Sequence, residues 1–134
     1  MIDLLVAGGG PAGLATAIYG ARAGLEVVVV ERRRGVVDKA CGEGLMPHSV
    51  RHLEALGADA HGRAFRGIRY LDGHHVAEAR FSGGAGRGVR RTVLHAALSD
   101  AVKEAGVEVV ARAVEDIVDV DGHVRVDDIE ARYL

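Results

Sequence analysis

Residues 2–13 read Ile-Asp-Leu-Leu-Val-Ala-Gly-Gly-Gly-Pro-Ala-Gly, an apolar run followed by a cluster of glycines. The first six residues form a short apolar run that is typical of a buried strand. Gly8, Gly10 and Gly13 follow in the spacing G-x-G-x-x-G. Pro11 suits the first position of a helix, because proline lacks the N–H that a first turn leaves unpaired. Apolar residues then recur at helical spacing, so the sequence predicts a strand, a tight glycine turn and a helix.

Each glycine of this turn has a physical role in binding a dinucleotide. Gly8 permits the sharp turn, Gly10 lets a pyrophosphate approach the backbone, and Gly13 allows the helix to pack closely on the strand. Free N–H groups and the positive end of the helix dipole face the phosphates. The glycine spacing therefore predicts a phosphate-binding turn at Gly8, Gly10 and Gly13.

An acidic residue ends the second apolar run. Residues 25–30, Leu-Glu-Val-Val-Val-Val, predict a strand, and Glu31 follows it. Glu31 lies 18 positions after Gly13, close to the ~20 expected for a carboxylate that binds ribose hydroxyls. Arg32 comes directly after this acid, which favours a contact with the adenosine or a phosphate. The sequence therefore predicts a Rossmann-like dinucleotide-binding unit.

Composition narrows the class of protein. The chain has 134 residues, 49% of them hydrophobic, which is enough for one domain with its own core. A net charge of −2 gives no indication of a nucleic-acid partner. The single cysteine, Cys41, excludes an internal disulfide and favours a cytoplasmic location. No apolar run reaches the ~20 residues of a transmembrane segment, and no set of residues predicts a metal site.

The rest of the chain predicts an α/β fold with a parallel sheet, a β-hairpin insertion and a three-stranded meander. We expect one nucleotide-binding region over residues 1–134, with its core in 1–34 and 91–134 and an insertion at 35–90. The further expected elements are a helix at 47–56, hairpin strands at 65–71 and 75–81, a helix at 92–105, a parallel strand at 107–110, and meander strands at 114–120, 123–126 and 129–134.

This arrangement resembles the N-terminal part of the flavoprotein superfamily that contains aromatic hydroxylases, flavin-dependent halogenases and geranylgeranyl reductases. Residues 8–13 match the family's GxGPAG, and Glu31-Arg32 matches its Glu-Arg after the second strand. Residues 39–45, Lys-Ala-Cys-Gly-Glu-Gly-Leu, resemble the Cys-Gly-rich segment of the geranylgeranyl reductase branch. Residues 89–94, with Leu98, resemble the family's Arg-x-x-Leu-x-x-x-Leu helix start.

The resemblance implies an FAD-dependent oxidoreductase, either a monooxygenase or a geranylgeranyl-reductase-like enzyme. It would use NAD(P)H or another reductant and act on a small-molecule or lipid substrate. By the same likeness, residues 8–13, which include Pro11 and Ala12, hold the pyrophosphate, and Glu31 holds the adenosine ribose. Val114 meets the adenine through its backbone, and Arg91, or as a second choice Arg90, meets the phosphate or ribityl region. The residues expected beside the isoalloxazine are Cys41, Gly42, Glu43 and Gly44. The resemblance assigns no catalytic residue.

The sequence also departs from the family. Its later Asp-Gly and Gly-Asp motifs are absent, so we expect a fragment that is inactive by itself. The family places a strand from further downstream beside residues 2–7. Without that strand, residues 2–7 would be an exposed edge that pairs with other chains. We therefore expect self-association, or pairing with a separate C-terminal half.

Two other functions share the glycine turn and Glu31. One is an NAD-binding dehydrogenase module, against which the long insertion and residues 41–44 argue. The other is a non-catalytic nucleotide-binding fragment, which the absent motifs leave open.

Overall fold

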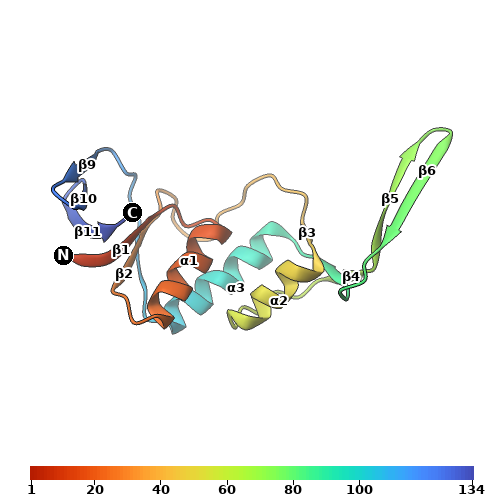
Figure 1. The fold of residues 1–134 in the computed structure, drawn as a ribbon, viewed down its shortest axis with the longest axis horizontal. Coiled ribbons are helices and arrows are strands. Elements are labelled where there is room, and N and C mark those ends of the chain that lie inside the picture. Colours follow the sequence, from red (N-terminus) through yellow and green to blue (C-terminus); the bar gives the residue numbers. More distant parts are fainter.

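The computed structural model describes residues 1–134 and shows an α/β fold drawn out along one axis (Figure 1). A six-stranded sheet has the order β8-β2-β1-β11-β10-β9. β1, β2 and β8 are parallel, as the sequence predicts. The strands of this sheet are β1 (Ile2–Ala7), β2 (Val27–Val30), β8 (Glu108–Val110), β9 (Ile117–Val120), β10 (His123–Val126) and β11 (Ile129–Tyr133).

Helices α1 (Pro11–Arg22) and α3 (Arg91–Glu104) pack together against the sheet. Alternation along the strands builds two cores, because successive side chains of a strand point to opposite faces. Val27 and Val29 lie in the core under the helices, whereas Leu5 and Val30 lie in a smaller core against the meander. No helix of the structure has the length and apolar character needed to span a membrane.

β11 lies parallel to β1, with Ile2 beside Ala131 and Leu4 beside Tyr133. The prediction that residues 2–7 form an exposed edge is therefore wrong, and self-association through that edge loses its basis. The turn at Asp127, with a left-handed φ of 53°, returns β11 antiparallel beside β10, and the other edge of β11 pairs with β1. Ala131 then packs in the same core cluster as Leu5, with both side chains fully buried.

The insertion forms two further sheets. One has the order β3-β7-β4, and the other is the hairpin predicted around Asp72-Gly73, which projects from the body (Figure 1). Helix α2 (Pro47–Ala55) packs Leu53 into the main core, so this part of the insertion is not a separate unit. The strands of the insertion are β3 (Gly44–Leu45), β4 (Arg63–Phe65), β5 (Gly67–Asp72), β6 (His75–Arg80) and β7 (Gly86–Gly88).

Candidate functional site: a cationic cavity at the glycine turn

A cavity of about 520 Å³ opens where β1 and β2 end and α1 begins. The carboxyl ends of these parallel strands meet at one edge of the sheet, where open α/β folds place their ligands. A backbone hydrogen bond of 2.8 Å from the N–H of Gly8 to the carbonyl oxygen of Val30 joins the two strand ends. The cavity is lined by Gly8, Gly10, Pro11, Ala12, Glu31, Arg32, Arg33, Val37, Lys39, Ala40 and Arg91.

The glycines of the turn meet different steric demands. Gly8 has a φ of +116°, which L side chains rarely adopt. A Cβ at Gly9 would lie 2.9 Å from the Cβ of Glu31, and one at Gly13 would overlap the carbonyl oxygen of Gly8. A Cβ at Gly10 would meet only Arg91, at 3.8 Å from Nη2. Three glycines therefore permit the turn itself, whereas Gly10 leaves space above it.

Glu31 is fixed by two backbone donors. The N–H of Gly9 donates to its Oε2 at 2.8 Å, and the N–H of Arg33 donates to its Oε1 at 2.9 Å. Burial raises the pKa of Glu31, but these hydrogen bonds and the charges of Arg33 and Arg32 outweigh burial and lower the pKa below its ordinary value. The carboxylate is thus ionised at neutral pH. Ionised Glu31 stabilises the folded state. This contribution is fully present above the ordinary pKa of a carboxyl group and is lost as the pH falls through the lowered pKa of Glu31.

The charges that line the cavity suit a pyrophosphate. Arg32, Arg33, Lys39 and Arg91 are cationic, whereas Glu31 is the one anionic group. The Nε of Arg91 is buried and has no hydrogen-bond partner in the chain, and a buried donor without a partner costs free energy. Open space above Gly10 and an unsatisfied guanidinium next to it fit an anionic ligand at this place.

Glu43 connects the Cys-Gly-rich segment to this cavity. Its Oε1 accepts a hydrogen bond of 3.1 Å from the N–H of Arg91, the first residue of α3. The expectation that this helix begins at Thr92 is wrong by one residue. Arg90, which precedes the helix, provides no side-chain cap, so a carboxylate from a distant loop satisfies this N–H instead.

We expect Glu43→Ala to lower the free energy of unfolding by about 1 kcal/mol, because an N-terminal N–H of α3 loses its acceptor and the helix dipole loses a negative charge. Urea unfolding followed by circular dichroism measures the change. Glu43→Gln is the matched control, since it keeps an oxygen acceptor without the charge and should lose less. Equal stability of the wild type and Glu43→Ala would show that this contact contributes nothing to the fold.

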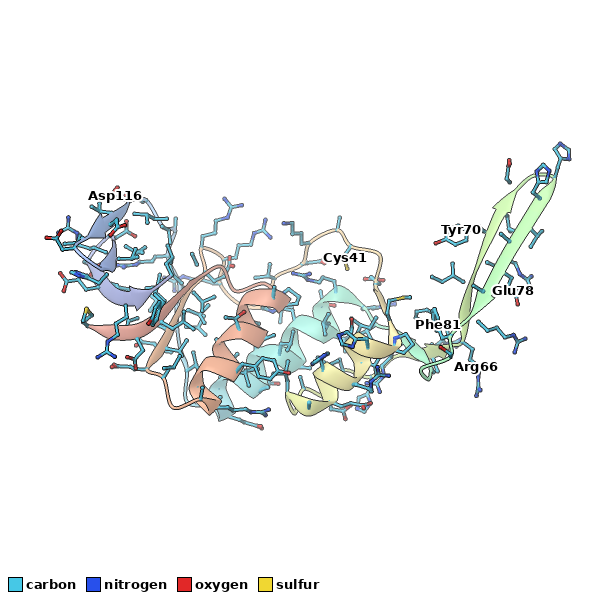
Figure 2. All side chains as sticks on the ribbon, viewed as in Figure 1. Cys41, Arg66, Tyr70, Glu78, Phe81 and Asp116 are labelled. Carbon is cyan, nitrogen blue, oxygen red and sulfur yellow. The ribbon has the colours of Figure 1, made fainter.

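The other predicted residues lie at different distances from the cavity lining. Cys41 is exposed on the loop that leads from β2 to β3 (Figure 2). Gly42 and Glu43 follow it on this loop, and Gly44 is the first residue of β3. None of these four residues lines the cavity. Val114 follows β8, and its side chain packs against the smaller core. Its backbone N–H and C=O make no hydrogen bond to another backbone group. The flavin and adenine contacts of these residues stay predictions.

Sequence reasoning did not predict the roles of four residues that shape the site, and one of them is Arg33, which lines the cavity and donates its backbone N–H to Glu31. Gly9 donates to Glu31, Lys39 lines the cavity, and His95 accepts and donates hydrogen bonds beneath the glycine turn. A signal for His95 was available, because it shares the buried face of α3 with Leu98 and Val102 at helical spacing. The contacts of Gly9 and Lys39 depend on loop conformation and have no comparable signal.

The parallel sheet, the glycine turn and the cationic cavity define a dinucleotide-binding α/β domain. The chain belongs to the FAD-binding domain family, which matches residues 1–125. FAD is therefore the cofactor to which the family points, and the NAD-binding alternative is not supported.

Similar proteins agree with this assignment. Over 55 residues, or 41% of this chain, it is 53% identical to a menaquinone reductase of Mycolicibacterium smegmatis. Over 76 residues, or 57% of this chain, it is 41% identical to a 6-methylpretetramide 4-monooxygenase of Streptomyces rimosus. A solved flavoprotein/dehydrogenase from Cytophaga hutchinsonii is 27% identical over 97% of this chain, with a TM-score of 0.81. The matched parts span 13%, 18% and 37% of these three proteins.

Proposed function

We propose that this chain binds FAD as the nucleotide-binding part of a flavin-dependent oxidoreductase. The observation that carries the proposal is the convergence of the glycine turn, Glu31 and four cationic side chains on one cavity. When bound, FAD carries two electrons between a reductant, here NAD(P)H or another donor, and the substrate. The protein supplies the binding, orientation and electrostatics.

Different residues hold different parts of the cofactor. The N–H groups at the start of α1, with Gly8, Gly10, Pro11, Ala12 and Gly13, receive the pyrophosphate, where the helix dipole favours negative charge. Glu31 accepts hydrogen bonds from the ribose, and Arg32 and Arg91 compensate the phosphate charge. Val114 offers its free backbone groups to the adenine. The segment Cys41, Gly42, Glu43 and Gly44 lies along the isoalloxazine.

The whole protein's chemistry is a further part of the proposal. The relatives include a reductase and a monooxygenase by name, so we propose a small-molecule or lipid substrate that is either reduced or oxygenated. We propose that the substrate site requires a C-terminal half, because the matched region spans a minor part of each relative. A cytoplasmic location is proposed from the single, free cysteine.

A visible spectrum of the purified chain tests the binding function. We expect flavin absorption that remains with the protein through gel filtration after incubation with FAD. Calorimetric titration of the same sample with FAD and with NADH gives the two affinities. Affinity for NADH without affinity for FAD would contradict the proposal.

Glu31→Ala is expected to weaken FAD binding by about 1–3 kcal/mol, the scale for hydrogen bonds to a charged group. The substitution removes the ribose acceptor and also leaves the N–H groups of Gly9 and Arg33 without their partner. Calorimetry on the wild type and the variant measures the difference. Glu31→Gln is the control, because it keeps one acceptor at the same reach and should bind with intermediate affinity. Equal affinities of all three proteins would remove Glu31 from the ribose site.

A further inference from the structure

His95 is the one polar or charged residue whose side chain is buried, with 4% of its surface exposed. It projects from α3 toward the glycine turn. Its Nε2 lies 2.8 Å from the carbonyl oxygen of Gly9, and its Nδ1 lies 3.3 Å from the backbone N of Val37. The hydroxyl of Ser99 lies 3.4 Å from the same Nδ1.

These partners determine the protonation state that the site accepts. The carbonyl of Gly9 can only accept, so Nε2 must carry a hydrogen and donate it. The N–H of Val37 can only donate, so Nδ1 must be free of hydrogen. The imidazole is therefore neutral, in the Nε2–H form. Adding a second proton would set Nδ1–H against the N–H of Val37 and break that hydrogen bond.

The two hydrogen bonds of His95 connect the glycine turn with the loop that follows β2. Gly9 is the middle of the glycine turn, and its own N–H holds Glu31. Val37 is buried, with 5% exposed, and lines the cavity together with Lys39 and Ala40, which lie two and three positions further along the same loop. One side chain of α3 thus fixes the turn and this loop relative to each other.

We propose that His95 is a positioning residue of the FAD site. Its neutral imidazole holds the glycine turn and the loop residues 37–40 in the arrangement that binds FAD, and protonation of the imidazole releases this loop. The inference rests on the proposed function, because it says how the hydrogen bonds of His95 to Gly9 and Val37 affect the affinity for FAD.

The surroundings of His95 contain other charged groups. It lines a second cavity of about 570 Å³ that also includes Gly9. The elements around it contribute Glu31, Arg33 and Arg34 from the end of β2, and Asp100 and Lys103 from α3; α1 and β8 contribute only apolar side chains to this cavity. Carboxylates, ammonium groups and guanidinium groups ordinarily change charge outside pH 5 to 8, whereas histidines change within it.

FAD titrations at pH 8 and pH 5 test the proposal on four proteins. FAD is the suitable probe because its pyrophosphate does not titrate between these values. For the wild type we expect the dissociation constant to rise about tenfold at pH 5, the scale of one hydrogen bond. His95→Gln keeps one donor and one acceptor but cannot titrate, so it should bind like the wild type at pH 8 and lose little at pH 5. His95→Leu should bind about tenfold more weakly at pH 8. His48→Gln, on the exposed face of α2, should retain the wild-type pH profile.

Amide exchange of Val37 without FAD gives a second readout. We expect its protection factor to be high at pH 8 in the wild type and in His95→Gln, and low in His95→Leu and in the wild type at pH 5. Equal protection in all of these samples would contradict the claim that His95 holds the loop through Val37. An equal loss of FAD affinity at pH 5 in the wild type and His95→Gln would contradict the claim that protonation of His95 releases the loop. Absence of FAD binding to the wild type at pH 8, with the expected exchange pattern, would instead contradict the proposed function alone.

Discussion

Gly13→Ala is expected to lower the free energy of unfolding by about 3 kcal/mol or more, at the upper end of overpacking substitutions. An added Cβ would overlap the carbonyl oxygen of Gly8 and approach a methyl group of Val6 at 3.2 Å. The carbonyl belongs to the turn itself, so relief requires α1 to move away from β1. Loss of that packing opens the core of which Leu14 is a buried member. Thermal and urea unfolding, followed by circular dichroism at the helix band, measure the change.

Gly10→Ala is the matched control for this prediction. The same methyl group at Gly10 would meet only Arg91, at 3.8 Å from Nη2, and the backbone there is ordinary extended chain, with φ −74° and ψ 175°. We expect its stability to remain near that of the wild type. If both alanine variants unfold at the wild-type midpoint, the close approach of helix and strand at Gly13 is not required.

Gly10→Val is expected to reduce FAD affinity by at least about 100-fold while the fold persists. The side chain would occupy the space above the turn, between the glycine backbone and Arg91, where the pyrophosphate is proposed to lie. The extended backbone at Gly10 accepts a β-branched residue without strain. A binding titration and a circular dichroism spectrum on one sample separate loss of binding from loss of structure.

Gly10→Ala serves again as the control, because its smaller side chain should weaken FAD binding less than valine does. Retained affinity in Gly10→Val would mean that this cavity does not hold the pyrophosphate. A collapsed spectrum in Gly10→Val would contradict the steric account, since the valine would then be meeting the protein rather than the cofactor.

The local pattern along residues 2–31 predicts its structure well. A strand, a turn that starts at Gly8, a helix from Pro11 and a second strand all occur as expected, and the structure adds that Gly8 has a positive φ. These features depend on residues that are close together in the sequence, so the periodicity of the apolar residues and the spacing of the glycines predict them directly. The predicted hairpin around Asp72-Gly73 is confirmed for the same reason.

Pairings between distant strands were less predictable. The meander was expected, but the parallel contact of β11 with β1 was not. That contact depends on the left-handed turn at Asp127 and on the burial of Ala131 against Leu5, two features that a single alternating pattern does not specify. The sequence does not predict the short strands β3, β4 and β7, because strands of two or three residues are too short to show an alternating pattern.

The glycine turn, the acid that follows the second strand and the resemblance to the flavoprotein family can all be recognised from the order of the residues alone. How the site is assembled around these features depends on the three-dimensional packing of the chain. Glu43 reaches Arg91 across 48 positions, and His95 reaches Gly9 across 86. Spacing along the chain reports neighbours within one helix or strand, whereas these contacts depend on how α3 packs beside the turn, and packing is set by the whole core.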